Sequence, residues 1–307
     1  MELTFLGTGA GVPSKARNVS CTLLKLLDER NEMWMFDCGE GSQQQFLKTT
    51  LKPRKVTKIF ISHVHGDHMY GLPGFLSSRS FQGGENVPLT IYGPKGVKKY
   101  VQTSLGISKT RLTYPIYYQE LDQSGIAFKD QQFTVKYATL DHIVPSYGFR
   151  VEEADSAGEL LIDKAREAGV PNGPLLGQLK AGLTIQLEDG RELQGKDFLG
   201  PDKRGKIVSI YGDTRYCQAG IDLAENADVL VHEATFEAGE EKMAHDYYHS
   251  TASQAAMVAK KAGVKQLYLT HISARYVGAM AKELQKGAEK IFPASQVVKD
   301  FDSYAIK

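Results

Sequence analysis

The stretch Ser62-His63-Val64-His65-Gly66-Asp67-His68 places three histidines and an aspartate within six residues, directly after the apolar run KIFI at 58–61. Neutral imidazole and carboxylate groups are donors that suit Zn²⁺. Four such donors in one short loop exceed what a single ion needs. The alternative is a solvated polar loop that holds no ion. The strict spacing favours a site for two metal ions.

Similar apolar, β-branched runs recur along the chain, and each is followed at once by a polar loop. Such runs predict buried strands. They are LTFLGTG, WMFDCGE, KIFISHVH, FTVKYATLDH, IVSIYGDT, VLVHEAT and LYLTHIS. Helical patterns lie between them, at 40–49, 68–80, 219–226, 253–262 and 280–290. Alternating strands and helices predict an α/β protein in which helices cover the layers of sheet.

Ionisable residues stand close to the ends of several of these runs. Because strand ends converge on one rim of a sheet, residues scattered in sequence can meet there in space. We expect five of them to do so: His63, His142, Asp213, His232 and His271. Taken alone, His142 or His271 could be an ordinary hydrogen-bonding histidine, and Asp213 a turn or cap residue.

The segment at about 150–200 interrupts the alternation. It contains a helix-like stretch at 157–168, a Pro/Gly-rich loop at 170–182 and a predicted hairpin closed by Asp189-Gly190. A chain of 307 residues could hold two average domains or one domain with an insertion. We interpret it as one domain over 1–307 with an insertion at about 150–200.

Composition indicates an ordinary globular protein. The chain has 42% hydrophobic and 24% charged residues, and its net charge of +1 does not by itself indicate a nucleic-acid-binding protein. Cys21, Cys38 and Cys217 are few and widely spaced, which predicts no disulfide framework. Neither a secretory leader nor a long apolar tract is evident. We therefore expect a cytoplasmic protein with no membrane partner.

The loop at 62–68 resembles the HxHxDH signature of the metallo-β-lactamase superfamily at every fixed position. That resemblance implies a four-layer αββα sandwich and a hydrolase with two Zn²⁺ ions per subunit. It also implies the ligand set: His63, His65 and His142 for one ion, Asp67, His68 and His271 for the other, and Asp213 bridging both.

Further stretches resemble the ribonuclease Z family and cover nearly the whole chain. Pro13–Asn18 matches that family's PxKxRN loop, and 232–235 and 249–251 match its HEAT and HST motifs. The resemblance implies an endoribonuclease that removes the 3′ trailer from precursor tRNA and leaves a 3′-hydroxyl on the tRNA. Lys15 and Arg17 would contact the substrate, although a solvated loop is the alternative.

The same resemblance implies three catalytic residues. Asp67 would serve as a ligand and as the acceptor of a proton from the attacking water. His249 would donate a proton to the leaving 3′ oxygen, and Glu233 would orient or charge that imidazole. Without the resemblance, His249 is equally well interpreted as part of the entry to a helix near Ser253.

Two further contacts with the substrate are expected, one from the family resemblance and one from the position of Arg275 four residues after His271. Gly173-Pro174 lies where bacterial members carry a Gly-Pro motif in a projecting, flexible arm that grips the tRNA body, although this arm is not conspicuously basic. Arg275 could face the scissile phosphate or be an exposed surface residue. The family is generally homodimeric, so a homodimer is expected as well.

Two other classes of function remain open from the residues. A lactonase or thioesterase on the same fold would need an apolar pocket and no arm. A non-catalytic RNA-binding or scaffolding protein would bind RNA without cleaving it, although the complete ligand set argues against this.

Overall fold

The computed structural model describes all 307 residues, which divide into two compact units. Unit 1 comprises Met1–Asp130, Thr134–Glu152 and Ile207–Lys307, and unit 2 comprises Gln131–Phe133 and Glu153–Lys206. Most of unit 2 thus coincides with the stretch that interrupts the strand–helix alternation in the sequence. No helix is long and apolar enough to cross a membrane.

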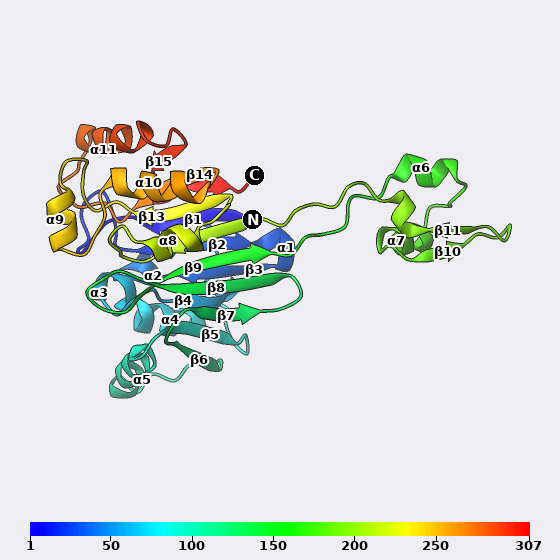
Figure 1. Ribbon diagram of the computed structural model, residues 1–307. Helices are drawn as coiled ribbons and strands as arrows, with labels where there is room; N and C mark the ends of the chain where they lie inside the picture. The colour runs from blue at the N-terminus through cyan, green and yellow to red at the C-terminus, as the bar shows by residue number, and fades with distance from the viewer. The chain divides into compact units, whose positions relative to one another are not determined.

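Unit 1 contains two mixed sheets of seven strands each (Figure 1). The first has the order β16-β1-β2-β3-β4-β5-β6. Its strands are β1 (Glu2–Gly7), β2 (Cys21–Leu26), β3 (Glu32–Phe36), β4 (Val56–Phe60), β5 (Leu89–Pro94), β6 (Ile116–Leu121) and β16 (Ser303–Ala305). Strands β3 to β6 run parallel to one another, and β1 pairs antiparallel with both β2 and β16.

The second sheet has the order β15-β14-β13-β12-β9-β8-β7. Its strands are β7 (Gly125–Lys129), β8 (Phe133–Leu140), β9 (Ser146–Glu153), β12 (Ile207–Tyr211), β13 (Val229–Glu233), β14 (Gln266–Thr270) and β15 (Ser295–Val297). Strands β12 to β15 are parallel, so β12, β13 and β14 end on the same edge.

Helices flank both sheets. Those of unit 1 are α1 (Leu27–Arg30), α2 (Ser42–Leu47), the 3₁₀ turn η1 (Pro53–Lys55), α3 (Gly66–Met69), α4 (Leu72–Phe81), α5 (Val97–Ile107), α8 (Gln218–Leu223), α9 (Glu241–Asp246), α10 (Ala252–Ala262) and α11 (Ala279–Glu289). One buried cluster joins α2, α4 and α5 to the first sheet, and another joins α8, α10 and α11 to the second.

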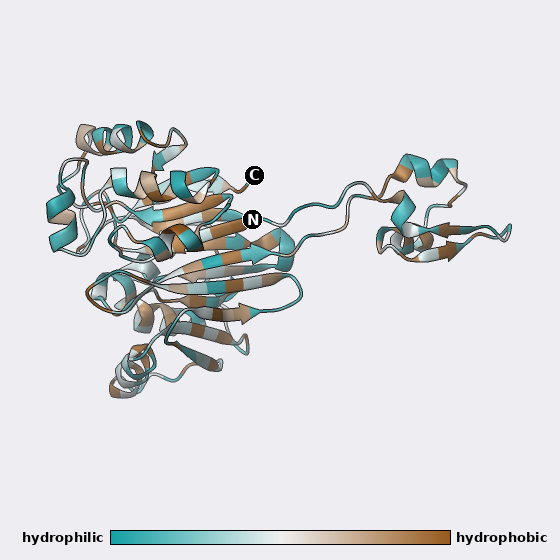
Figure 2. Ribbon diagram, in the orientation of Figure 1, coloured by the Kyte–Doolittle hydropathy of each residue, from teal (hydrophilic) through white to brown (hydrophobic).

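The two sheets pack face to face through aromatic side chains. Phe149 of the second sheet lies 5.3 Å from Phe60 and 5.8 Å from Phe36 of the first, measured between ring centroids. Side chains alternate along β3, so Phe36 faces the other sheet while Met35 packs into the cluster with the helices. Hydrophobic residues are accordingly concentrated in the strands (Figure 2). The result is a four-layer αββα sandwich.

Unit 2 has a small core of its own. It contains α6 (Ile162–Glu167), α7 (Pro174–Lys180), the hairpin β10 (Thr184–Gln186) and β11 (Glu192–Gln194), and the 3₁₀ turn η2 (Gly195–Phe198). Leu179, Ile185 and Phe198 are buried together. The hairpin expected at Asp189-Gly190 is confirmed, and Gly190 takes the positive φ of 88° that such a turn favours.

Two helix predictions were too long. The stretch expected to be one helix at 68–80 is divided into α3 and α4 at Gly71, where an added Cβ would lie 2.1 Å from the Gly39 carbonyl oxygen. The helix expected at 157–168 begins only at Ile162, because Leu160 instead pairs with Leu199 in an isolated β-bridge. Helices α1, α5, α7 and α9 were not predicted, and α7 lies within the stretch that was expected to be a Pro/Gly-rich loop.

All three cysteines are free. Burial raises the pKa of the Cys21 thiol to about 12 and raises that of Cys38 well above its ordinary value. Cys217 is partly exposed. The absence of a disulfide framework agrees with the expectation from the cysteine spacing.

Candidate metal centre and active site

Loops that follow four strands carry the expected metal ligands to one place. His63 lies just beyond β4, His142 beyond β8, Asp213 beyond β12 and His271 directly after β14. His65 is the residue that precedes α3. The seven expected ligand residues form two groups of four, in which the donor atoms all lie within 4.8 Å of one another and Asp213 is shared.

The first group contains His63, His65, His142 and Asp213. Nδ1 of His65 lies 3.1 Å from Nε2 of His63 and 3.3 Å from Nε2 of His142. Oδ2 of Asp213 lies 3.6 Å from Nε2 of His63. A tetrahedral ion at about 2.0–2.1 Å from each nitrogen would hold its ligand atoms about 3.3–3.4 Å apart, so these spacings fit one ion.

The second group contains Asp67, His68, Asp213 and His271. Nε2 of His271 lies 3.3 Å from Nε2 of His68, 3.2 Å from Oδ2 of Asp67 and 3.4 Å from Oδ1 of Asp213. Nε2 of His68 is also 3.3 Å from Oδ1 of Asp213. These spacings fit a second ion equally well.

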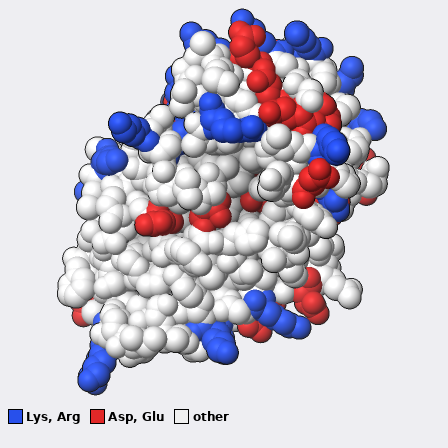
Figure 3. Space-filling view, turned by 90° about the vertical axis from the view of Figure 1, so that its left-hand side faces the viewer, with Lys and Arg blue, Asp and Glu red and all other residues white.

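Asp213 turns one carboxylate oxygen toward each group, which is the arrangement a bridging ligand requires. The residue is 2% exposed. Burial disfavours its charge, but His271, His68 and His63 outweigh this and hold its pKa well below the ordinary value. A buried carboxylate surrounded by imidazoles is a donor set for divalent cations. Figure 3 shows acidic side chains within a hollow on the side of the molecule where α3 and α9 lie in Figure 1.

Hydrogen bonds at the outer ring nitrogens hold the imidazoles in place. Nδ1 of His68 lies 2.7 Å from Oδ2 of Asp37, and Nδ1 of His142 lies 2.8 Å from the carbonyl oxygen of Tyr248. Nδ1 of His271 lies 2.9 Å from Oγ1 of Thr235. In each ring Nδ1 is occupied, which leaves the lone pair of Nε2 for a metal ion.

Three residues of this region have positive φ angles although they are not glycines. They are Asp37 at 59°, Tyr248 at 60° and His271 at 54°. Such conformations cost on the order of 1 kcal/mol or more each and are concentrated at functional sites. His271 is an expected ligand, and Asp37 and Tyr248 each hydrogen-bond another expected ligand. Their unusual backbone conformations agree with a binding site at this place.

His249 and Glu233 form a pair beside the two groups. Nδ1 of His249 lies 2.9 Å from Oε1 of Glu233, and the imidazole retains 18% exposure while the carboxylate is buried. Burial lowers the pKa of His249, but the charge of Glu233 and its hydrogen bond outweigh that effect and raise it to about 9. The pairing with Glu233 thus favours the protonated imidazole, which is the form able to donate a proton.

Glu233 is better suited to charging His249 than to binding an ion, although Glu233, His249 and His271 also cluster. Its two oxygens already accept four hydrogen bonds, from the backbone N–H of Thr214, from the N–H and hydroxyl of Thr235, and from His249. No carboxylate lone pair is left facing a third metal position.

Asp67 is held from outside the metal groups as well. The backbone N–H of Gly11 donates a hydrogen bond of 2.8 Å to Oδ2 of Asp67. Burial raises the pKa of Asp67, but the neighbouring imidazoles of His271 and His68 outweigh it and lower the pKa below its usual range. The carboxylate is thus ionised and fixed in position.

Relatives of known name match the chain along its whole length. A profile of the family described as "Anti-Pycsar protein Apyc1" matches residues 1–157. Ribonuclease Z of Lactobacillus gasseri is 60% identical over 306 residues, which are 100% of this chain and 99% of the relative. The chain belongs to the ribonuclease Z family. Ribonuclease Z of Lactiplantibacillus plantarum is 58% identical over 98% of this chain and 97% of its own.

Solved structures agree with this family and confirm the fold. Human tRNase Z, short form, has a TM-score of 0.71 and 31% identity, with both chains fully covered. The Bacillus subtilis metallo-β-lactamase fold protein YhfI has a TM-score of 0.67 at 20% identity, with 99% of this chain and 98% of that chain covered. The four-layer metallo-β-lactamase sandwich expected from the sequence is therefore the fold of this ribonuclease Z family member.

The expected substrate contacts of this ribonuclease Z family member lie in different surroundings. Lys15 is exposed, whereas Arg17 is 8% exposed and donates to the hydroxyl of Thr8 and the carbonyl of Val298. Arg275 is half exposed and pairs with Glu240 at 3.3 Å.

Gly173 and Pro174 begin α7 in unit 2, with Gly173 at a φ of 153°. No atom lies within 4 Å of where a Cβ at Gly173 would stand.

His232 does not join the metal groups, so the expectation that it meets the others was wrong. It lies within β13 rather than after it. Its ring packs 5.4 Å from that of Tyr211 and hydrogen-bonds the Glu233 carbonyl at 2.7 Å. Alternation along the strand turns His232 away from the side on which Glu233 reaches His249.

One supporting network was missed by the sequence analysis of this ribonuclease Z family member. Arg215 forms two hydrogen bonds of 2.9 Å with Asp141, and its guanidinium carbon lies 4.1 Å from the ring centre of Tyr248. Tyr248 in turn accepts the hydrogen bond from His142. Arg215 therefore helps to position His142, an expected metal ligand, through Tyr248. The position of a backbone carbonyl has no signal in sequence, so no pattern could have found this contact.

Proposed function

We propose that this chain is a zinc-dependent endoribonuclease that removes the 3′ trailer from precursor tRNA and leaves a 3′-hydroxyl on the tRNA. The proposal rests on two four-donor groups that share Asp213, with the His249–Glu233 pair beside them. The full-length likeness to ribonuclease Z supports this substrate over others. Each subunit would hold two Zn²⁺ ions.

Two divalent ions held in these groups would lower the pKa of a water molecule and neutralise charge on the phosphodiester. Asp67 would accept the proton that the attacking water releases. One of its oxygens is anchored by the N–H of Gly11, which fixes the carboxylate in position for this transfer. Attack occurs at the phosphorus that follows the last nucleotide of the mature tRNA.

His249 would donate its proton to the departing 3′ oxygen. The imidazole is partly exposed, so it can meet a substrate, and Glu233 behind it keeps it charged and oriented. The phosphate then stays with the trailer, and the tRNA keeps its 3′-hydroxyl. Positioned proton transfer of this kind contributes about 10²–10⁴-fold to a rate.

Unit 2 is proposed to contact the body of the tRNA. Its own buried core makes it a separate folded element, and Gly173 and Pro174 present an exposed helix start. The chain is further proposed to act as a homodimer in the cytoplasm, the compartment that holds precursor tRNA.

A cleavage assay on a precursor-tRNA transcript tests this function. We expect zinc-dependent cutting that stops with a chelator and resumes when Zn²⁺ is restored, with a product whose 3′ end maps to a hydroxyl after the mature sequence. Parallel assays on a generic lactone and a thioester provide the comparison with a small-molecule hydrolase. Turnover of those compounds without cleavage of the transcript would refute the proposal, and so would RNA binding without cleavage.

A further inference from the structure

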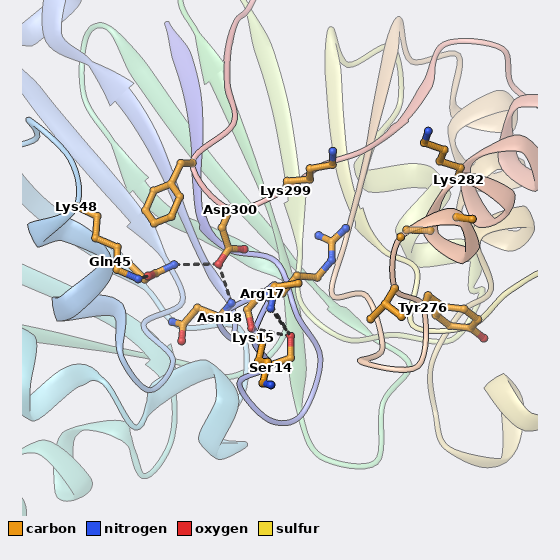
Figure 4. Close-up of a pocket in the computed structure, with 16 residues that line it drawn as sticks. Ser14, Lys15, Arg17, Asn18, Gln45, Lys48, Tyr276, Lys282, Lys299 and Asp300 are labelled. Atoms are coloured by element: carbon orange, nitrogen blue, oxygen red, sulfur yellow. Dashed lines mark hydrogen bonds between the residues drawn. The ribbon is translucent and has the colours of Figure 1, made fainter.

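A groove of about 760 Å³ includes none of the expected metal ligands in its walls. Three segments distant in sequence build it: the loop at 14–18, the stretch at 276–282 and the residues 299–301 (Figure 4). Gln45 and Lys48 of the α2 region close one side. The volume is in the range of ligand sites, which is about 300–1,000 Å³.

The groove is strongly positive. Four exposed lysines, which form no ion pair, line it: Lys15, Lys48, Lys282 and Lys299. The one carboxylate in the walls, Asp300, is already engaged by the hydroxyl of Thr8 at 2.6 Å and the N–H of Asn18 at 2.7 Å. This local charge differs from the near-neutral chain as a whole and is suited to a polyanion.

An aromatic ring is exposed within this positive wall. Phe301 is 41% exposed although it is a large apolar residue, and Nζ of Lys48 lies 5.7 Å from the centre of its ring. Its backbone is held at a φ of 71°, and its N–H donates to the carbonyl of Phe5 at 2.6 Å. An aromatic face among lysines is the combination by which proteins bind unpaired nucleotides.

The groove is continuous in the chain with the metal centre. The loop that contributes Lys15 also contributes Gly11, whose N–H binds Asp67. The N–H of Ala10 donates to the carbonyl of Ile272, next to His271. The stretch at 276–282 follows shortly after that ligand. The groove is therefore built in part by chain segments that also contact the expected metal ligand Asp67 and the residue next to the expected ligand His271.

We propose that this groove binds the unpaired 3′ trailer of the precursor, with one base stacked on Phe301 and its phosphates on Lys282 and Lys299. This inference rests on the proposed function. A paired acceptor stem would not offer a free base face to Phe301. Stacking and phosphate contacts are also tolerant of sequence, as a site for trailers that differ among precursors must be.

Steady-state cleavage of two precursors tests the proposal. One carries a one-nucleotide trailer, and the other carries a trailer of about eight nucleotides, a length that single-strand sites accommodate. We expect the wild type to show a lower KM for the longer trailer. Phe301→Ala should reduce the ratio of the two KM values by at least about fivefold, because the change removes the ring on which one base would stack.

Two matched variants test whether an aromatic ring, rather than the size of the side chain, is needed at position 301. Phe301→Trp should keep the preference, whereas Phe301→Leu, which preserves an apolar side chain but has no aromatic face, should lose it. Lys282→Ala combined with Lys299→Ala should make the KM for the longer trailer less dependent on salt. The slope of log KM against log salt concentration should fall by about 0.7 for each phosphate that is no longer bound. The one-nucleotide substrate shows in the same assay whether each variant is folded.

The outcomes separate this inference from the proposed function. If the wild type cleaves neither precursor, the proposed function fails. If it cleaves both with equal KM, or if Phe301→Leu keeps the preference as fully as Phe301→Trp, the trailer groove is refuted while the endonuclease proposal stands. An equal change in KM for both precursors in the double-lysine variant would also overturn it.

Discussion

Replacing Glu233 with glutamine should disable His249 as an acid while keeping the shape of the site. Glu233 is 1% exposed, and each of its oxygens accepts a hydrogen bond from a backbone N–H. The amide nitrogen of glutamine must therefore face one of those donors. We expect the free energy of unfolding to fall by about 1–3 kcal/mol, the typical cost of a buried donor left unpaired.

The effect on cleavage follows from the pKa of His249. The negative charge of Glu233 raises this pKa to about 9 against the opposing effect of burial. Without that charge it should fall to the ordinary value near 6.5 or below. At pH 8 the protonated fraction would then drop about 30-fold. Bound metal ions would add the same positive charge to the wild type and to the variant. The prediction is therefore the difference in the pKa of His249 between the two proteins.

The assay is kcat as a function of pH with two precursors, one with the normal 3′ oxygen and one with sulfur at that bridging position. A thiolate departs without a proton because thiols have a pKa of about 8.5. Glu233→Gln should lose activity on the oxygen substrate, regain it as the pH falls below about 6.5, and retain activity on the sulfur substrate. Glu225→Gln, at an exposed glutamate, is the matched control. Equal losses on both substrates would refute the acid role.

Three further results are expected. Asp67→Asn should abolish cleavage but leave precursor-tRNA affinity, measured by fluorescence anisotropy, largely intact; loss of both would indicate a folding defect instead. Arg215→Ala should weaken binding of one of the two ions by about 10–100-fold in a chelator competition, because Arg215 supports the carbonyl that orients His142. A thiol reagent should label only Cys217 in the native protein, since the other two thiols are buried with raised pKa values, and all three after denaturation.

Much of the candidate metal centre could be predicted from sequence because its expected ligands directly follow apolar runs. His63, Asp213 and His271 each stand within a few residues of a strand end, and the strands carry them to one edge. His232 shows the limit of this rule. Its apolar run stops at Val231, but strand β13 continues to Glu233, so His232 lies within a strand and its side chain points away from the expected ligands.

Other features of the site depend on contacts that no local pattern records. The N–H of Gly11 and the carbonyl of Tyr248 act through the backbone, so the identity of their side chains says nothing of them. The trailer groove gathers lysines from segments far apart in the chain, while the net charge of the whole remains +1. Only the folded chain brings these residues together.

Metal content measured on active protein tests the central claim most directly. Elemental analysis, combined with anomalous diffraction at the zinc edge, should give two ions per chain, one in each four-donor group, with Asp213 between them. Asp213→Asn should weaken the binding of both ions. A protein that cleaves precursor tRNA with a single ion, or with none in these groups, would contradict the account.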